Sequence, residues 1–104
     1  MSRDGVILLM YDLSMKTKEE VHYYNIFRKN IIKNGFVFLQ ESVYYRYIRY
    51  TNMSNYVIKN VLSKVSRNAN IRFIIMTVLQ FERMNRYSLT KIDLSSYRKD
   101  IIII

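Results

Sequence analysis

The first strong hydrophobic pattern in the chain is a continuous run that ends at an aspartate. Residues 5–11, GVILLMY, contain no charged side chain, and Asp12 follows them directly. A run without alternation is typical of a strand that is buried on both faces. An aspartate after a strand is common in turns, and it can also serve a metal or phosphate site. The pattern alone favours the turn and leaves the site open.

The next pattern predicts a helix. Thr17 and Glu20 have the spacing of a capping box, in which each side chain bonds the other residue's backbone amide. Gly35 stands where a helix commonly ends with a residue in the left-handed conformation. Apolar positions recur at helical spacing between these signals, and they are Val21, Tyr24, Phe27 and Ile31.

Residues 36–50, FVFLQESVYYRYIRY, are rich in aromatic and β-branched side chains and contain neither glycine nor proline. This composition is typical of strands, although the run is long for one. It predicts either one bent strand or two short strands joined by a tight turn or bulge near Tyr44 and Tyr45. Gln40 and Ser42 are two residues apart, so on one strand they would share a face and either support a site or fill a polar seam.

A second helix and another buried strand follow. Asn52 or Ser54 can cap the helix. The strand covers residues 71–78, IRFIIMTV, and the segment LQFERM after it predicts one helical turn. The inward positions of the second helix are apolar, and they are Val57, Ile58, Val61, Leu62 and Val65.

The order of these elements predicts an α+β fold, a ferredoxin-like βαββαβ sandwich in a single domain over residues 1–104. Right-handed crossovers place both helices on one face of an antiparallel sheet. The other face then needs a cover, and a second copy of the chain is the simplest one. Residues 84–98 predict an irregular connection, and residues 99–104, KDIIII, predict an extra C-terminal strand. The β-branched end of that strand suits a dimer contact, through Ile101, Ile102, Ile103 and Ile104.

Composition limits the chemistry that the chain can perform. It has 104 residues and no cysteine, so disulfides, zinc–thiolate sites and thiol catalysis are excluded. His22 is the sole histidine, and we expect it to face solvent without a catalytic role. Any metal would therefore be a hard cation bound by oxygen atoms, that is magnesium, manganese or calcium.

Charge favours a polyanionic partner. Seventeen Lys and Arg residues against eight Asp and Glu give a net charge of +9. This balance favours nucleic acid over a membrane, although a solvated basic surface explains it equally well. Acidic residues are absent between Glu41 and Glu82. The candidate contacts to duplex phosphates, which position without reading sequence, are Lys16, Lys18, Arg46, Arg49, Lys59, Lys64 and Arg67.

The tyrosines of the central segment allow two interpretations. They could stack on bases, as aromatic side chains do in single-strand binding proteins. Packing within the sheet and its interfaces is the favoured interpretation, and it applies to Tyr44, Tyr45, Tyr47 and Tyr50.

The two ends of the chain predict a cytoplasmic protein. Arg3 and Asp4 precede an apolar run that Asp12 ends too early for a secretory leader. The terminal isoleucine run is far too short to span a membrane.

Five short motifs together resemble a known family. They are MYDLS at 10–14, YNIFRKNIIKNGF at 24–36, LQESVYYR at 39–46, TVLQFERM at 77–84 and the final isoleucine run. In order and spacing they resemble the CRISPR-associated adaptation protein Cas-two (Cas2), a family of CRISPR-associated endoribonucleases, in its type II-like branch. The match covers nearly the whole chain. Ser14 stands where type II members often have proline, and residues 85–98 have no clear counterpart.

The resemblance implies a homodimer whose C-terminal strand packs onto the partner's sheet. It implies that Asp12 of each subunit lies near the two-fold axis and binds Mg²⁺, with Mn²⁺ as the other candidate, for metal-dependent cleavage of RNA or duplex DNA. It also implies a role in spacer acquisition, in which the dimer bridges Cas-one integrase dimers and binds prespacer duplex DNA. In type II members the bridging role can be the only physiological one, so enzyme activity stays open.

Two alternatives belong to other classes. One is a non-catalytic RNA-binding module of RRM-like topology, which predicts glycines and paired aromatics on the third strand. The segment IRFIIMTV has neither, which counts against it. The other is a stand-alone ribonuclease toxin on the same fold.

Overall fold

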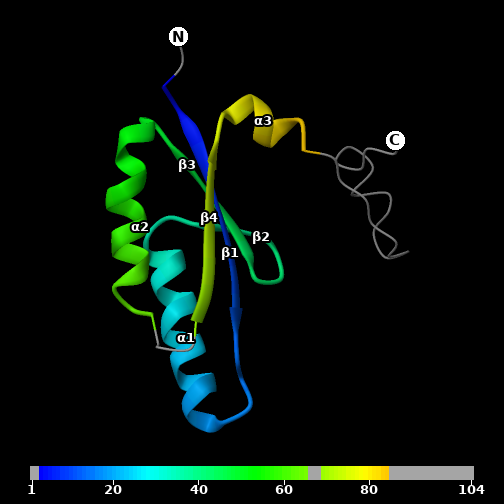
Figure 1. Cartoon of the computed structure of the whole chain (residues 1–104), viewed down its shortest axis with the longest axis vertical. Coiled ribbons are helices and arrows are strands. Elements are labelled where there is room, and N and C mark those ends of the chain that lie inside the picture. Colours follow the sequence, from blue (N-terminus) through cyan, green and yellow to red (C-terminus); the bar gives the residue numbers. More distant parts are fainter. Residues whose placement is uncertain (1–2, 66–68, 85–104) are drawn as a thin grey trace, which may run out of the picture.

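A four-stranded antiparallel sheet with two helices on one face forms the body of the protein (Figure 1). The computed structural model describes residues 3–65 and 69–84. The strand order is β2-β3-β1-β4, which confirms the ferredoxin-like arrangement. Nearly all of the predicted connection at 84–98 and the whole predicted C-terminal strand lie outside the described residues. The elements in chain order are β1 (Gly5–Leu13), α1 (Lys18–Lys33), β2 (Val37–Gln40), β3 (Val43–Ile48), η1 (Thr51–Met53), α2 (Ser54–Leu62), β4 (Ala69–Met76) and α3 (Val78–Glu82).

The central strand β1 is buried on both faces, as its continuous apolar run predicts. Val6, Ile7 and Leu9 have no exposed surface, and β1 pairs antiparallel with both β3 and β4. The prediction that the strand stops before Asp12 is wrong. Because β4 begins as early as Ala69, its first residues pair with the end of β1 and extend the strand through Asp12 to Leu13.

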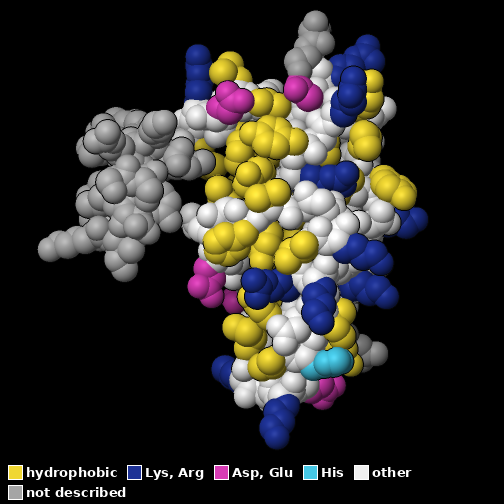
Figure 2. All heavy atoms as spheres, turned by 180° about the vertical axis from the view of Figure 1, so that it is seen from behind, with side chains coloured by type: hydrophobic (Ala, Val, Ile, Leu, Met, Phe, Trp, Pro, Cys, Tyr) yellow, Lys and Arg dark blue, Asp and Glu magenta, His cyan; other side chains and the backbone are white. Residues whose placement is uncertain are grey.

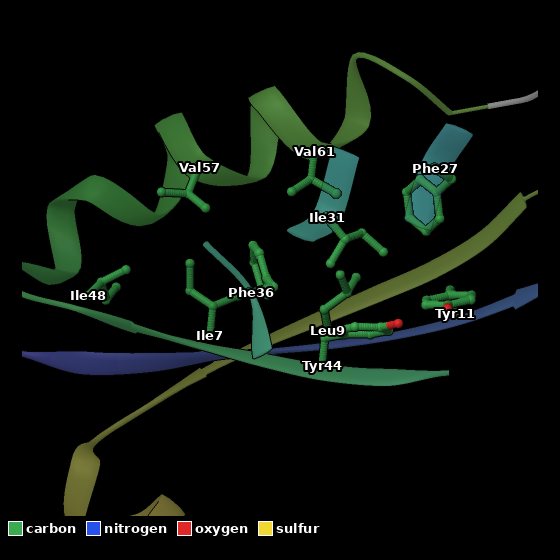
Figure 3. Packing of buried hydrophobic residues seen from close by; sticks show 10 residues of the cluster. All are labelled: Ile7, Leu9, Tyr11, Phe27, Ile31, Phe36, Tyr44, Ile48, Val57 and Val61. Atoms are coloured by element: carbon green, nitrogen blue, oxygen red, sulfur yellow. The ribbon is translucent and has the colours of Figure 1, made fainter. Parts of the chain in front are cut away.

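Alternation along β1 builds one hydrophobic layer on each face of the sheet. Ile7 and Leu9 belong to the layer under the helices, with Phe27 and Ile31 of α1 and Val57 and Val61 of α2 among its members (Figure 3). Val6 and Leu8 point to the opposite face, where they cluster with Phe81 of α3. We call the second surface the helix-free face because the two long helices, α1 and α2, pack on the other one; the short helix α3 contacts the helix-free face at its Val6 end.

Helix α1 begins and ends as predicted. Thr17 accepts a hydrogen bond from the Glu20 amide at 3.1 Å, and the Glu20 carboxylate accepts one from the Thr17 amide at 3.0 Å. Gly35 has a φ of +86°, the left-handed conformation expected after a helix. Of the predicted inward stripe, Phe27 and Ile31 are buried, whereas Val21 is 39% exposed.

Residues 36–50 form a hairpin, so the two-strand alternative is confirmed and its predicted turn position is wrong. The turn lies at Glu41 and Ser42 rather than near Tyr44 and Tyr45. Ser42 has a φ of 62°, which is the left-handed conformation. A serine can adopt it, but a serine in the sequence does not predict it. Tyr44 instead belongs to the interior of β3, where it is 3% exposed.

The predicted caps of α2 are wrong. A short 3-10 turn, η1, leads into α2, and no side chain bonds the first amides. Ser54 is buried in the first turn of the helix, and Asn52 lies within η1. The C-terminal end is held from α1 instead, because the Asn30 side-chain amide donates to the Asn60 and Val61 carbonyls at 3.1 and 3.0 Å.

The final helical turn carries a second capping box. Thr77 leaves β4 and accepts a hydrogen bond from the Gln80 amide at 3.0 Å, while the Gln80 side chain accepts one from the Thr77 amide at 2.9 Å. This confirms the helical turn predicted after the strand at 71–78. The prediction that this strand is buried is wrong, because β4 lies at the edge of the sheet and none of its residues is buried. None of the helices in residues 3–65 and 69–84 combines the length and the apolar character needed to cross a membrane.

The Asn30 contact predicts a sensitive link between the two helices. Asn30→Ala removes both hydrogen bonds to the end of α2, so the free energy of unfolding should fall by about 1–3 kcal/mol. Urea denaturation measures the change. Asn25→Ala, at an exposed position of the same helix, is the matched control and should change stability by less than about 0.5 kcal/mol. Equal effects of the two substitutions would contradict the link.

Candidate functional site

Asp12 projects from the helix-free face near one end of the sheet. It alternates with Met10, Leu8 and Val6 on β1, and it is exposed. Its cross-strand partner on β4 is Asn70. The carboxylate is therefore held on a paired strand rather than in a turn, which removes the turn interpretation while leaving its role to be tested.

Tyr11 fixes the backbone on the other side of the same strand. Its side chain is 7% exposed and meets the ring of Phe27 edge-on at 5.2 Å and the ring of Tyr44 in a stacked arrangement at 6.2 Å. Its hydroxyl lies 3.4 Å from that of Tyr24, and its amide donates to the Ser42 carbonyl at 3.1 Å. Because neighbouring residues of a strand point to opposite faces, this anchor directs Asp12 away from the helices.

Burial raises the pKa of the Tyr11 phenol well above its ordinary value, and the hydrogen bond with Tyr24 raises it further. The neutral phenol is thus the form that the folded protein accommodates.

The metal chemistry available to one chain is limited. A carboxylate oxygen suits Mg²⁺ or Mn²⁺, but these ions ordinarily need several oxygen ligands. In residues 3–65 and 69–84, His, Cys, Asp and Glu side chains nowhere gather in a group of three that could bind a metal. Among the described residues, Asp12 therefore belongs to no group of ligands that could bind such an ion.

The predicted pairing of Gln40 and Ser42 on one strand face is wrong. Gln40 is the last residue of β2 and pairs with Val43, whereas Ser42 lies in the turn. Ser42 does adjoin the candidate site through its carbonyl, which accepts from the Tyr11 amide.

The candidate phosphate contacts are spread over the molecule. Lys16 and Lys18 precede or begin α1 at the Asp12 end of the sheet, whereas Arg49 follows β3 at the opposite end, where Gly5 pairs with Ile48.

Arg46 lies on the helix side of β3. A side chain at Gly35 would come within 3.2 Å of its Nε, so this approach needs the glycine. Lys59 and Lys64, in and just after α2, are exposed, and Arg67 lies outside the described residues. Seen from behind, Lys and Arg side chains follow the border on which α1 and α2 lie (Figure 2).

Packing accounts for most of the central tyrosines, as predicted. Tyr44 is buried in the layer under the helices, and Tyr45 lies 4.9 Å from Phe81 on the helix-free face. Tyr47 also contacts Phe81 edge-on while staying half exposed, and Tyr50 is 47% exposed. His22 is exposed, as expected.

The buried phenol predicts a pH dependence. Above the ordinary tyrosine pKa of about 10, the unfolded chain loses the Tyr11 proton while the folded chain keeps it, so stability falls as pH rises. Relative to Tyr11→Phe, the wild-type free energy of unfolding should fall by up to about 1.4 kcal/mol for each further pH unit. Urea denaturation between about pH 8 and about pH 11, from two pH units below that pKa to one unit above it, measures it. Tyr23→Phe, on an exposed tyrosine, is the control, and parallel curves for wild type and Tyr11→Phe would contradict the buried phenol.

Comparison with known proteins gives the family. The search against protein-family models found no match. A CRISPR-associated endoribonuclease Cas2 of Campylobacter jejuni is 37% identical over 78 residues, which are 75% of this chain and 54% of that protein. The chain thus spans about half of that relative's length. The protein of the same name from Ligilactobacillus salivarius is 30% identical over 79 residues, 76% of this chain and 78% of the relative.

A third relative of that name, from Parvibaculum lavamentivorans, is 30% identical over 81 residues, 78% of this chain and 80% of that protein. Matches of this extent agree with the order of the sequence motifs and with the strand order of the sheet. The chain belongs to the family of the CRISPR-associated endoribonuclease Cas2.

Proposed function

We propose that this protein is a homodimeric subunit of CRISPR spacer acquisition, which bridges Cas-one integrase dimers and binds prespacer duplex DNA. We further propose that two copies of Asp12 form a divalent-cation site for endonucleolytic cleavage of RNA or DNA. The observation that carries the proposal is the position of Asp12, exposed on the helix-free face of the sheet and fixed by the buried Tyr11 beside it. The family of the chain supports this function over an RRM-like module or a stand-alone toxin.

The helix-free face supplies a reason for two copies to associate. Val37, Tyr47 and Ile74 lie on this face by strand register, and they are 50%, 51% and 47% exposed. Covering such side chains with a second copy removes apolar area from water and brings the face that carries Asp12 toward its symmetry mate.

The described part of one chain gathers no group of three metal-binding side chains, and a second copy of Asp12 would add a second carboxylate. Carboxylate oxygens from two copies of Asp12 suit Mg²⁺, or Mn²⁺ as the alternative, because hard cations prefer oxygen ligands. When bound, the ion would activate a water molecule and offset charge on the scissile phosphate. Without an ion, the two carboxylates would repel each other.

The distribution of basic residues supports an extended ligand. Lys16 and Arg49 lie at opposite ends of β1, whose nine residues span about 30 Å at the usual strand rise. Charges over such a length suit a duplex, which carries one phosphate charge for about every 1.7 Å of its axis. Lys59 and Lys64 add contacts along the helical side.

Asp12→Asn tests the shared metal site. The substitution should abolish the increase in melting temperature that Mg²⁺ gives the wild type, and with it any Mg²⁺-dependent cleavage. Without metal, the dimer should be as stable as the wild type or slightly more stable, because the carboxylate repulsion is gone. Thermal melting with and without Mg²⁺, together with sedimentation, measures both effects.

Glu41→Gln removes an exposed carboxylate from the neighbouring turn and is the control that should keep the Mg²⁺ response. A metal response that persists undiminished in Asp12→Asn would show that the ion binds elsewhere. Spacer integration with the Cas-one integrase should survive the Asp12 substitution, because bridging uses surface and shape. Its loss in a folded dimer would contradict that division of roles.

The basic surface predicts salt-dependent, sequence-independent duplex binding. If the dimer neutralises about six to eight phosphates, the logarithm of affinity should fall against the logarithm of salt concentration with a slope of about −5 to −7. Reversing Lys59 and Lys64 to Glu should make this slope shallower without creating a sequence preference. Reversal of Arg3 and Arg83, which changes the charge equally, should affect the slope less. A slope near zero in the wild type would refute the interpretation.

A further inference from the structure

The helix-free face changes character along the β1–β4 pair. Strand register places Met76 beside Val6 and Ile74 beside Leu8, at the end that Phe81 covers. At the other end the same face carries polar side chains, where Arg72 pairs with Met10 and Asn70 pairs with Asp12. The polar end therefore combines one carboxylate, one amide and one guanidinium on adjacent strands.

Arg72 is placed to act next to Asp12. The two residues are diagonal neighbours across β1 and β4, a relation in which backbones are about 7–8 Å apart and long side chains reach each other. Arg72 is exposed. Asp12 is exposed as well, so both side chains are open to a ligand from outside.

We propose that Arg72, assisted by the Asn70 amide, is a positioning residue that binds a nucleic-acid phosphate beside Asp12. The guanidinium presents planar paired donors that match two oxygens of a phosphate, and an amide adds a third donor. A carboxylate alone would repel the phosphate that cleavage must bring to it, whereas an adjacent guanidinium attracts it. The inference rests on the proposed site at Asp12 and adds the group that holds the substrate there.

Binding measured in EDTA tests this without metal or cleavage. The probes are a labelled single-stranded RNA and a labelled DNA duplex of the same sequence, titrated at several salt concentrations. Arg72→Gln should weaken binding of the phosphate-bearing probe by about tenfold, since a hydrogen bond to a charged group is lost. The salt slope should become shallower by about 0.7 for each lost contact to a single strand or about 0.9 for a duplex. If the loss of affinity and the shallower slope occur with the RNA probe, the phosphate that Arg72 binds is that of RNA. If they occur with the duplex probe, it is that of DNA.

The matched control is Arg3→Gln, which removes the same charge about 30 Å from Asp12, at the other end of β1. It should change the affinity much less. Arg72→Lys keeps the charge and should retain the slope while losing part of the affinity, because an ammonium cannot match two oxygens in one plane. Melting temperatures without nucleic acid verify that each variant is folded.

A double-mutant cycle links the phosphate to Asp12. Asp12→Asn should strengthen binding in EDTA, because it removes a negative charge beside the phosphate, and this gain should shrink in the Arg72→Gln background. Additive effects would overturn the inference, as would an Arg72→Gln variant that binds both probes like the wild type.

These outcomes are distinct from failure of the proposed metal site, which the Mg²⁺ response of Asp12→Asn reports separately. A wild type that binds neither probe would overturn the inference and the proposed nucleic-acid binding together.

Discussion

The burial of β1 between two apolar layers determines what each side of the sheet can do. Ile7 and Leu9 belong to the layer under the helices, and Val6 and Leu8 belong to the layer with Phe81. Because side chains alternate, a shift of one residue would exchange the two sets. It would place the Asp12 side chain in the apolar layer under the helices, where an ionised carboxylate is strongly disfavoured. The apolar pairing of β1 thus fixes the exposure of Asp12.

The adjacent residues Tyr11 and Asp12 of β1 consequently have different roles. Tyr11 is surrounded by aromatic rings and keeps its proton, so its contribution to the site is positional. Asp12 is exposed on the other face, where Asn70 is its cross-strand partner, and its chemistry depends on what approaches from outside. The same face is apolar near Phe81 and polar near Asp12. In the proposed dimer, hydrophobic contact would bring two copies together at one end of this face, and charge would have to be balanced at the other.

Local signals in the sequence predicted the elements, and nonlocal pairing decided the details of the site. The Thr17–Glu20 capping box and the left-handed Gly35 depend only on neighbouring residues, and both are confirmed. Thr77 and Gln80 show the same spacing, and this signal could have predicted the start of α3. The turn at Ser42 was missed because a serine with positive φ has no strong sequence signature.

Contacts between distant segments could not be predicted in the same way. Asn30 holds the end of α2 from 30 residues away, and no pattern in either segment indicates this partner. The neighbours of Asp12 on β4 depend on the register of two strands that are separated by most of the chain. Periodicity identifies which face a residue occupies but not which residue lies beside it.

Charge and geometry make different demands on the two proposed activities. Duplex binding needs many weak phosphate contacts over a long surface, and a single chain already presents basic residues at both ends of β1 and on α2. Cleavage by the proposed metal site needs several oxygen ligands at one point, and the described part of a single chain gathers no group of three around Asp12. The first activity therefore follows from the basic surface of each subunit, whereas the second follows from how two subunits align. A small change in that alignment could remove the metal site and leave the duplex surface intact, which makes the two activities separable on one fold.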